Sequence, residues 1–250
     1  MTQDRCRITE KKIDINYNNT LNFFKNRANK YVKNNPYAVT MYQDKNPQIV
    51  EKRNKAEIDK LLPLLNLDHE SIVLDIACGI GRWSDAIKCN IKSYYGIDFS
   101  EDLIDIARRR VVSYNRKFYV GKALDIEKVK KENNISNVNR VLLIGILMYL
   151  NDIDLSELAH QILNVICYKS IICIREPIGI KNRLTLNNFY SEELNDNYNA
   201  IYRTREEIKS IFIDIFEKNG FTILEEGNVF EDGFNNRKET NQYYFILERT

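Results

Sequence analysis

The stretch "VLDIACGIGRW", residues 73–83, decides the fold. It opens with an apolar run typical of a buried strand, carries Asp75 inside that run, and then places Gly79 and Gly81 two positions apart. Such glycines let the backbone turn closely around a ligand at the start of a helix. A dinucleotide site needs a third glycine in the pattern G-x-G-x-x-G, and this sequence has Ser84 there. The stretch therefore predicts a strand-to-helix turn that holds a ligand other than a dinucleotide.

The sequence around this stretch alternates between apolar strands and amphipathic helices. The strand candidates are "IVLDIA", "SYYGID", "KFYVGKAL", "RVLLIGIL" and "SIICIRE", and helical patterns or turns separate them. This spacing predicts an α/β fold with a Rossmann-like, doubly wound sheet of seven strands. The last two strands, "FTILEEGNVF" and "NQYYFILER", are expected to form an antiparallel hairpin at the C-terminus.

Residues 1–66 differ from the rest, because they contain helical patterns and no strand candidate. We expect an N-terminal helical cap at residues 1–66 and a ligand-binding domain at residues 67–250. The alternation stops at about residues 177–203, which are polar and aromatic. Long insertions beside an α/β site are typical of functional lids, so we predict a lid there.

Composition bounds the partners of the chain. Lys and Arg total 37 against 35 Asp and Glu, a net charge of +2, which argues against nucleic acid as a partner. The five cysteines lack the spacing of metal ligands or of a disulfide framework, so no metal is expected. The sequence shows no apolar leader and no run of roughly 18 apolar residues. We expect a cytoplasmic protein without a membrane partner, and the oligomeric state is left open.

Two acids indicate which ligand the turn holds. Asp75 precedes the glycines, where it would repel a pyrophosphate but suits a cofactor with an ammonium group. Asp98 ends the next strand about twenty residues on, where a carboxylate can accept both ribose hydroxyls. S-adenosylmethionine (SAM) combines adenosine, no phosphate and a charged amino-acid end. We therefore predict SAM as the cofactor and S-adenosylhomocysteine (SAH) as its product.

Four motifs carry a resemblance to a known family. "VLDIACGIGRW", "YYGIDFSEDLI", "YVGKALDIE" and "VLLIGILMYLND" resemble the successive motifs of class I SAM-dependent methyltransferases, over most of the chain. The resemblance implies a set of cofactor-binding residues: Asp75, Ala77, Cys78, Gly79, Gly81, Arg82, Trp83, Asp98, Phe99, Ser100, Ala123, Leu124, Asp125, Gly145 and Ile146. At Lys122 many relatives carry an acid, so backbone groups or Asp125 are expected beside the adenine. From the cap, Tyr42 and Arg53 are predicted to close over SAM and meet its carboxylate.

The acceptor side offers two catalytic candidates. Tyr149 follows the fourth strand and Glu176 ends the fifth, at strand ends where ligands bind in such sheets. Both are also predicted to bind the acceptor, together with residues of the insertion: Arg183, Tyr190, Tyr202 and Arg203. Arginines present paired donors to anions, so we predict a small anionic acceptor methylated on oxygen rather than nitrogen. The flanking regions resemble a bacterial branch that modifies sugars and surface polysaccharides, including phosphoramidate methyltransferases.

Rival functions lack their own signatures. A nucleic-acid amino-methyltransferase would show (Asp/Asn)-Pro-Pro-aromatic where this chain reads "GILMYLND". A cytosine-C5 enzyme would need a loop cysteine, whereas Cys167 and Cys173 lie in apolar helix and strand contexts. The missing third glycine disfavours a dehydrogenase. Two alternatives stay open, namely a non-catalytic SAM-binding regulator and a methyltransferase that acts on a macromolecule.

Overall fold

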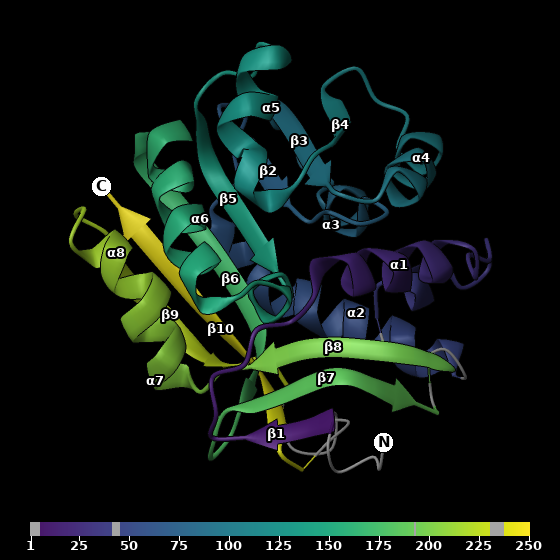
Figure 1. Cartoon of the computed structure of the whole chain (residues 1–250). Coiled ribbons are helices and arrows are strands. Elements are labelled where there is room, and N and C mark those ends of the chain that lie inside the picture. Colours follow the sequence, from purple (N-terminus) through teal and green to yellow (C-terminus); the bar gives the residue numbers. More distant parts are fainter. Residues whose placement is uncertain (1–5, 42–45, 193, 231–237) are drawn as a thin grey trace.

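A computed structural model describes residues 6–41, 46–192, 194–230 and 238–250 (Figure 1). The strands are β1 (Arg7–Thr9), β2 (Ile72–Ile76), β3 (Ser93–Asp98), β4 (Arg116–Val120), β5 (Val138–Ile144), β6 (Ile166–Gly179), β7 (Leu184–Ser191), β8 (Asp196–Tyr202), β9 (Thr222–Asn228) and β10 (Thr240–Arg249). The α-helices are α1 (Tyr17–Ala28), α2 (Pro47–Leu61), α3 (Arg82–Ala86), α4 (Glu101–Arg110), α5 (Ile126–Glu132), α6 (Asp152–Val165), α7 (Arg205–Ile208) and α8 (Asp214–Glu217).

The main sheet contains seven strands in the order β4-β3-β2-β5-β6-β10-β9. Neighbours from β4 to β6 pair in parallel, while β10 pairs antiparallel with both β6 and β9. This confirms the predicted α/β fold, with its doubly wound seven-stranded sheet and its C-terminal hairpin. The alternating apolar and helical patterns were sufficient to predict it, because parallel strands need helical crossovers.

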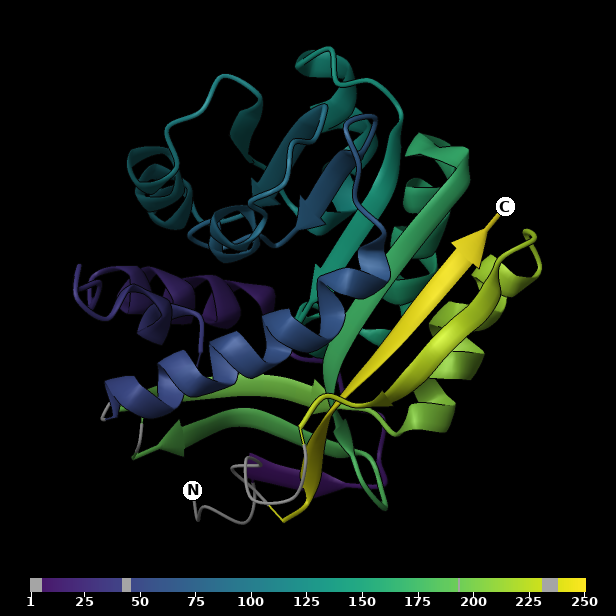
Figure 2. The same cartoon turned by 180° about the vertical axis from the view of Figure 1, so that it is seen from behind.

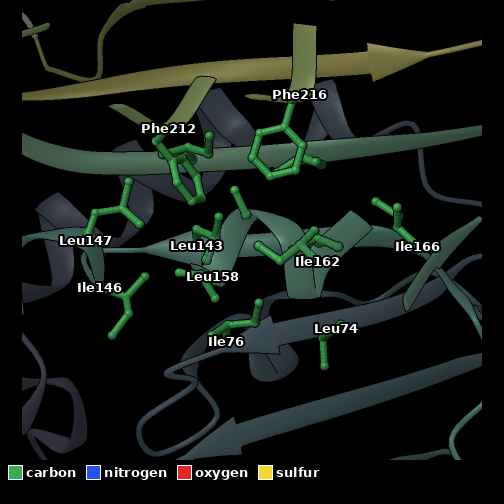
Figure 3. Packing of buried hydrophobic residues seen from close by; sticks show 14 of the residues in the cluster. Leu74, Ile76, Leu143, Ile146, Leu147, Leu158, Ile162, Ile166, Phe212 and Phe216 are labelled. Atoms are coloured by element: carbon green, nitrogen blue, oxygen red, sulfur yellow. The ribbon is translucent and has the colours of Figure 1, made fainter. Parts of the chain in front are cut away.

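Apolar side chains cover both faces of the main sheet. Leu74 and Ile76 of β2 point into one cluster, and Val73 points into another on the opposite face. Figure 3 shows the first cluster, where Phe212 and Phe216 pack against the same core as Leu74 and Ile76. Burial on both faces fixes the register of the strands, so their carboxyl ends meet at one edge.

A second, three-stranded antiparallel sheet lies beside that edge, in the order β1-β7-β8. Figures 1 and 2 show α1 and α2 crossing the molecule between this small sheet and the parallel strands. Two predictions need correction here. Residues 1–66 are not free of strands, because β1 pairs with β7. The predicted lid at 177–203 contains the last residues of β6 and then β7 and β8, two strands of the small sheet.

Local signals explain most element boundaries. Asn16 and Asn46 cap α1 and α2 by accepting backbone N–H groups with their side chains. Thr204 forms a capping box at α7, and a π-helical turn at residues 209–213 joins α7 to α8. Cys167, expected in a helix, lies in β6, because the chain passes directly from α6 into that strand. Within the described residues, no helix combines the length and apolar composition that a membrane span requires.

Candidate active site

A cavity of about 320 Å³ opens at the carboxyl ends of β2, β3 and β5, and α1, α2 and β8 contribute to its wall. Many of the predicted site residues line it: Arg53, Asp75, Ala77, Cys78, Gly79, Arg82, Trp83, Asp98, Phe99, Ala123, Leu124, Gly145, Ile146, Tyr149 and Tyr202. Residues from four sequence motifs and from the N-terminal segment therefore meet at one place. Tyr42 lies outside the described residues.

The turn after β2 bends by left-handed backbone conformations. Ala77, Gly79 and Gly81 have φ angles of 63°, 55° and 77°, a region that side chains disfavour. A Cβ at Gly79 would lie 2.8 Å from Cγ2 of Thr40, so only glycine fits between the turn and the N-terminal segment. Gly81 does not line the cavity. Its missing side chain instead makes room for Phe118, whose ring a Cβ there would approach to 3.1 Å.

Two buried carboxyl groups face this turn. Asp98 accepts the backbone N–H groups of Gly79 and Ser100, each at 2.9 Å, and Asp75 accepts the hydroxyl of Tyr94. Burial raises the pKa of Asp75 to about 7 and that of Asp98 to about 6, although these hydrogen bonds act in the opposite direction. A cation or a pair of hydroxyl donors in the cavity would stabilise both carboxylates.

Some predicted cofactor residues lie behind the cavity wall. Ser100 and Asp125 do not line it. The Ser100 hydroxyl caps α4 by accepting the N–H of Leu103 at 3.4 Å, and only the backbone N–H of this residue contacts Asp98. The lining residues at the expected adenine edge include Lys122, together with Gly121.

Cys78 and Trp83 line the cavity and also belong to a hydrophobic core cluster of the main sheet. Burial raises the pKa of the Cys78 thiol well above its ordinary value, so the group stays protonated and unreactive at neutral pH. The indole N–H of Trp83 is buried and has no hydrogen-bond partner among the described residues. Neither side chain offers a nucleophile.

Glu176 holds the turn that carries Tyr149. Its Oε1 accepts the N–H groups of Ile146 and Leu147 at 2.7 and 2.8 Å, and its Oε2 accepts that of Met148 at 3.3 Å. Burial raises the pKa of Glu176 to about 7 despite these three bonds. The carboxyl group does not line the cavity. The prediction of Glu176 as a base or acceptor ligand therefore needs correction, because all its contacts serve the turn.

Arg203 holds the same turn from the other side. Its Nη1 and Nη2 donate to the carbonyl groups of Leu147 and Leu150, both at 2.7 Å, and its Nε donates to Asp152 at 2.8 Å. Arg183 is also paired with Asp152, at 2.9 Å. Both arginines are buried outside the cavity lining.

Tyr190, also predicted to bind the acceptor, does not reach the cavity. It is half exposed, donates its hydroxyl to Asn195 at 2.7 Å, and lies outside the cavity lining. Sequence reasoning assigned Arg183, Arg203 and Tyr190 to the acceptor because they lie in the insertion that was predicted to be a lid. Their side chains instead stabilise the small sheet and the turn after β5.

Aromatic side chains form the wall opposite the main sheet. The hydroxyl of Tyr149 lies 3.2 Å from that of Tyr198, which accepts the hydroxyl of Tyr202 at 3.4 Å. The ring of Phe24 packs edge-on against Tyr149 and Phe99, with centroids 5.1 and 5.8 Å apart. Helix α1 supplies part of this wall, which the sequence indicated only as an amphipathic helix.

A buried ion cluster forms another part of the wall. Glu57 of α2 is fully buried and pairs with Arg82 at 2.5 Å and with Arg175. Burial alone would raise the pKa of Glu57, but the two guanidinium groups bring it below its ordinary value. Nη1 of Arg82 also donates to Asn54 at 2.9 Å. Sequence reasoning missed Glu57 and Arg175, because nothing in the chain order brings α2 next to the end of β6.

The described part of the chain contains no candidate metal site, because nowhere in it do three or more His, Cys, Asp or Glu side chains cluster as a metal ion would need.

Comparisons with known proteins agree with this geometry. Residues 73–167 match the family model described as "Methyltransferase domain". The chain is 31% identical over 78 residues to the demethylmenaquinone methyltransferase of Bacillus licheniformis. This match covers 30% of this chain, and the chain spans only 34% of the length of that curated relative.

Solved structures match over nearly the whole chain. The magnesium protoporphyrin IX methyltransferase of Synechocystis, with bound SAM, has a TM-score of 0.58 at 16% identity, and 94% of each chain is covered. The mycolic acid cyclopropane synthase CmaA1, complexed with SAH and CTAB, has a TM-score of 0.63 at 11% identity. That match covers 96% of this chain and all of the synthase.

The sheet order, the matched residues and these neighbours define a class I SAM-dependent methyltransferase fold. Within it, residues 73–167 are the part that matches the methyltransferase family model. The resemblance drawn from the sequence is confirmed at the level of this class. The narrower likeness to sugar- and polysaccharide-modifying enzymes stays a prediction.

Proposed function

We propose that this chain is a SAM-dependent methyltransferase that modifies a small molecule held in the cavity. The observation that carries the proposal is the convergence of Asp75, Gly79, Asp98 and Gly145 on one cavity at the switch point of the sheet. Ligands bind at such points in doubly wound sheets. The relatives with bound SAM or SAH support the same cofactor here.

The residues present fit SAM. Asp98 keeps a lone pair on each carboxylate oxygen for the ribose hydroxyls, because each oxygen accepts only one backbone N–H. Asp75 is a buried acid, and its raised pKa shows that burial destabilises its carboxylate form. An ammonium group beside it would stabilise that form. Arg53 from α2 lines the cavity and is proposed to meet the carboxylate of the amino-acid end.

SAM supplies a methyl group on a sulfonium, so its leaving group is already activated. The protein then acts mainly by holding two reactants in line, which can contribute roughly 7–11 kcal/mol. Tyr149, Tyr198 and Tyr202 present hydroxyl groups from the acceptor wall and are proposed to orient an acceptor oxygen. Tyr149 remains the catalytic candidate that its place after β5 suggests.

The narrower acceptor class is a small anionic metabolite, methylated on oxygen rather than nitrogen. The lid arginines no longer support it, but Arg53, Arg82 and Arg175 line the cavity, and within the described residues Glu57 alone pairs with the last two. A nucleotide-linked, phosphorylated or phosphoramidate intermediate of surface polysaccharide synthesis fits this chemistry. This acceptor class is supported by the resemblance of the flanking sequences to enzymes that modify sugars and surface polysaccharides.

The deciding experiment incubates the purified protein with methyl-labelled SAM and a bacterial extract split by size and charge. We expect label in small anionic metabolites. Label in protein or nucleic acid would favour the macromolecular alternative. Binding of SAH without transfer to any fraction would favour the non-catalytic regulator. A chain that binds neither SAM nor SAH would contradict the proposal.

A further inference from the structure

Arg175 is the last residue of β6 that pairs with β5, and one hydrogen-bond donor of its side chain has no partner among the described residues. Its Nη1 donates to Gln242 at 3.3 Å and its Nη2 pairs with Glu57, but its buried Nε–H has no partner among the described residues. The side chain is only 12% exposed and lines the cavity. A buried donor left unpaired costs about 1–3 kcal/mol, so the protein leaves part of the hydrogen-bonding capacity of this guanidinium unmet.

The charge around Arg175 favours an anion. Glu57 is shared by two guanidinium groups, those of Arg82 and Arg175, so the cluster of three side chains carries one excess positive charge. The pKa of Glu57 lies below its ordinary value, so this balance holds at neutral pH. Thr240 and Gln242 of β10 line the adjacent wall and add neutral hydrogen-bonding groups.

The strand order places Arg175 beyond the proposed cofactor contacts. Asp98, Asp75 and Gly145 lie at or next to the carboxyl ends of β3, β2 and β5, which are consecutive in the sheet. Arg175 lies on the next strand, β6. Neighbouring strands are about 4.8 Å apart. A Cβ at Gly145 would lie 3.2 Å from Nη1 of Arg175, so the guanidinium borders the last cofactor contact on its acceptor side.

We infer that Arg175 anchors an oxyanion of the methyl acceptor, a phosphoryl or carboxylate group, beside Thr240 and Gln242. Glu57 is then a positioning residue that fixes the plane of the guanidinium. This inference rests on the proposed function, because it assumes that the neighbouring subsite holds SAM. It replaces the predicted lid arginines with Arg175 of β6 as the source of acceptor charge selectivity.

The test uses calorimetric titration of the full chain saturated with SAH, which fills the amino-acid carboxylate subsite first. Inorganic phosphate and, separately, acetate are titrated in a low-chloride buffer. We expect saturable binding of at least one anion at one site per chain. Arg175→Gln should weaken that binding at least tenfold, Arg175→Lys should weaken it less, and the exposed control Arg109→Gln should leave it unchanged.

The outcomes separate this inference from the proposed function. If SAH binds and neither anion does, the acceptor subsite is wrong and the methyltransferase proposal stands. If SAH does not bind at all, the proposed function itself fails. Loss of SAH affinity in a folded Arg175→Gln variant would assign Arg175 to the cofactor and overturn the inference. Should that variant not fold, Gln242→Leu and the wild-type titration still decide.

Discussion

At the scale of single residues, Asp98 joins the ligand-binding turn to the proposed ribose site. Its oxygens hold the N–H groups of Gly79 and Ser100, so it orders the turn before any ligand arrives. Pre-ordered hydrogen bonds to a charged group contribute about 1.5–3 kcal/mol each. Its loss should therefore weaken ligand binding and also destabilise the turn, which loses two hydrogen-bond acceptors.

Asp98→Ala is expected to weaken SAH binding at least tenfold, because the ribose contact and the order of the turn are lost together. Isothermal titration calorimetry measures the affinity, and far-ultraviolet circular dichroism checks the fold. Asp105→Ala on the exposed side of α4 is the matched control and should bind SAH normally. Unchanged affinity in Asp98→Ala would remove Asp98 from the site.

The pKa values of the two acids predict how binding depends on pH. Burial raises the pKa of Asp75 to about 7 and that of Asp98 to about 6, so both are partly protonated near pH 6. A ligand with an ammonium group prefers the ionised forms, which exist above these pKa values. SAH affinity should therefore rise roughly tenfold between pH 5.5 and 8 and then level off.

Calorimetry in two buffers with different ionisation enthalpies should show proton release on SAH binding at pH 6.5. Asp75→Asn cannot release the Asp75 proton, so its affinity should be lower at pH 8 and should depend less on pH, with Asp98 still titrating. An affinity that falls as the pH rises would contradict the assignment of the ammonium site.

At the scale of structural elements, the short turn after β5 is the most constrained part of the site. Glu176 accepts its N–H groups and Arg203 donates to its carbonyl groups, so both kinds of backbone group are satisfied by buried charges. Backbone groups outside helices and sheets need such partners when they are buried. The turn in consequence presents Tyr149 to the cavity in one fixed position.

Glu176→Ala should lower the free energy of unfolding by about 2–4 kcal/mol, because it leaves three backbone N–H groups without their acceptor. The measurement is the urea unfolding midpoint, with the exposed Glu132→Ala as the matched control. A variant as stable as the control would show that water replaces the carboxylate without cost.

The elements also show how far sequence reasoning reaches. The strands and helices from β2 to β6 follow from local pattern alone, because apolar runs of strand length alternate with amphipathic helical segments. β1 is only three residues long, and its partner β7 is distant in sequence, so no local pattern marks it. The ligand-binding turn was predictable from Gly79 and Asp98, whereas Glu57 and Arg175 required knowledge of tertiary packing.

At the scale of the whole molecule, buried acids link stability to pH. The raised pKa values of Asp75, Asp98 and Glu176 mean that the folded chain binds more protons than the unfolded chain between about pH 4 and 7. Stability falls with rising pH wherever the folded state binds more protons. The free energy of unfolding of the ligand-free protein should therefore decrease from pH 5 to pH 8.

Urea unfolding at several pH values measures this slope, and saturating SAH should flatten it by favouring the ionised acids. Asp75→Asn should make the dependence of stability on pH less steep even without ligand, because residue 75 then has no carboxyl proton to lose. Rising stability over the same range would mean that these acids ionise freely in the folded protein.

The pairing of β1 with β7 affects the order in which parts of the fold form. It joins residue 7 to residue 186, and α1 rests on β8 through Phe23 and Tyr198, whose ring centroids are 5.3 Å apart. Residues 7–28 are synthesised before β7 and β8, so they must wait for the small sheet before their wall of the cavity can form. Contacts so distant in sequence form late and open first.

Hydrogen exchange should therefore find the amides of α1 exchanging faster than those of β2 and β5 in the free protein. Saturation with SAH should slow the exchange of α1, since a ligand in the cavity stabilises its closed wall. Equal protection of α1 and the central strands before SAH is added would contradict this order. The last step of folding would then also be the step that opens and closes the binding site.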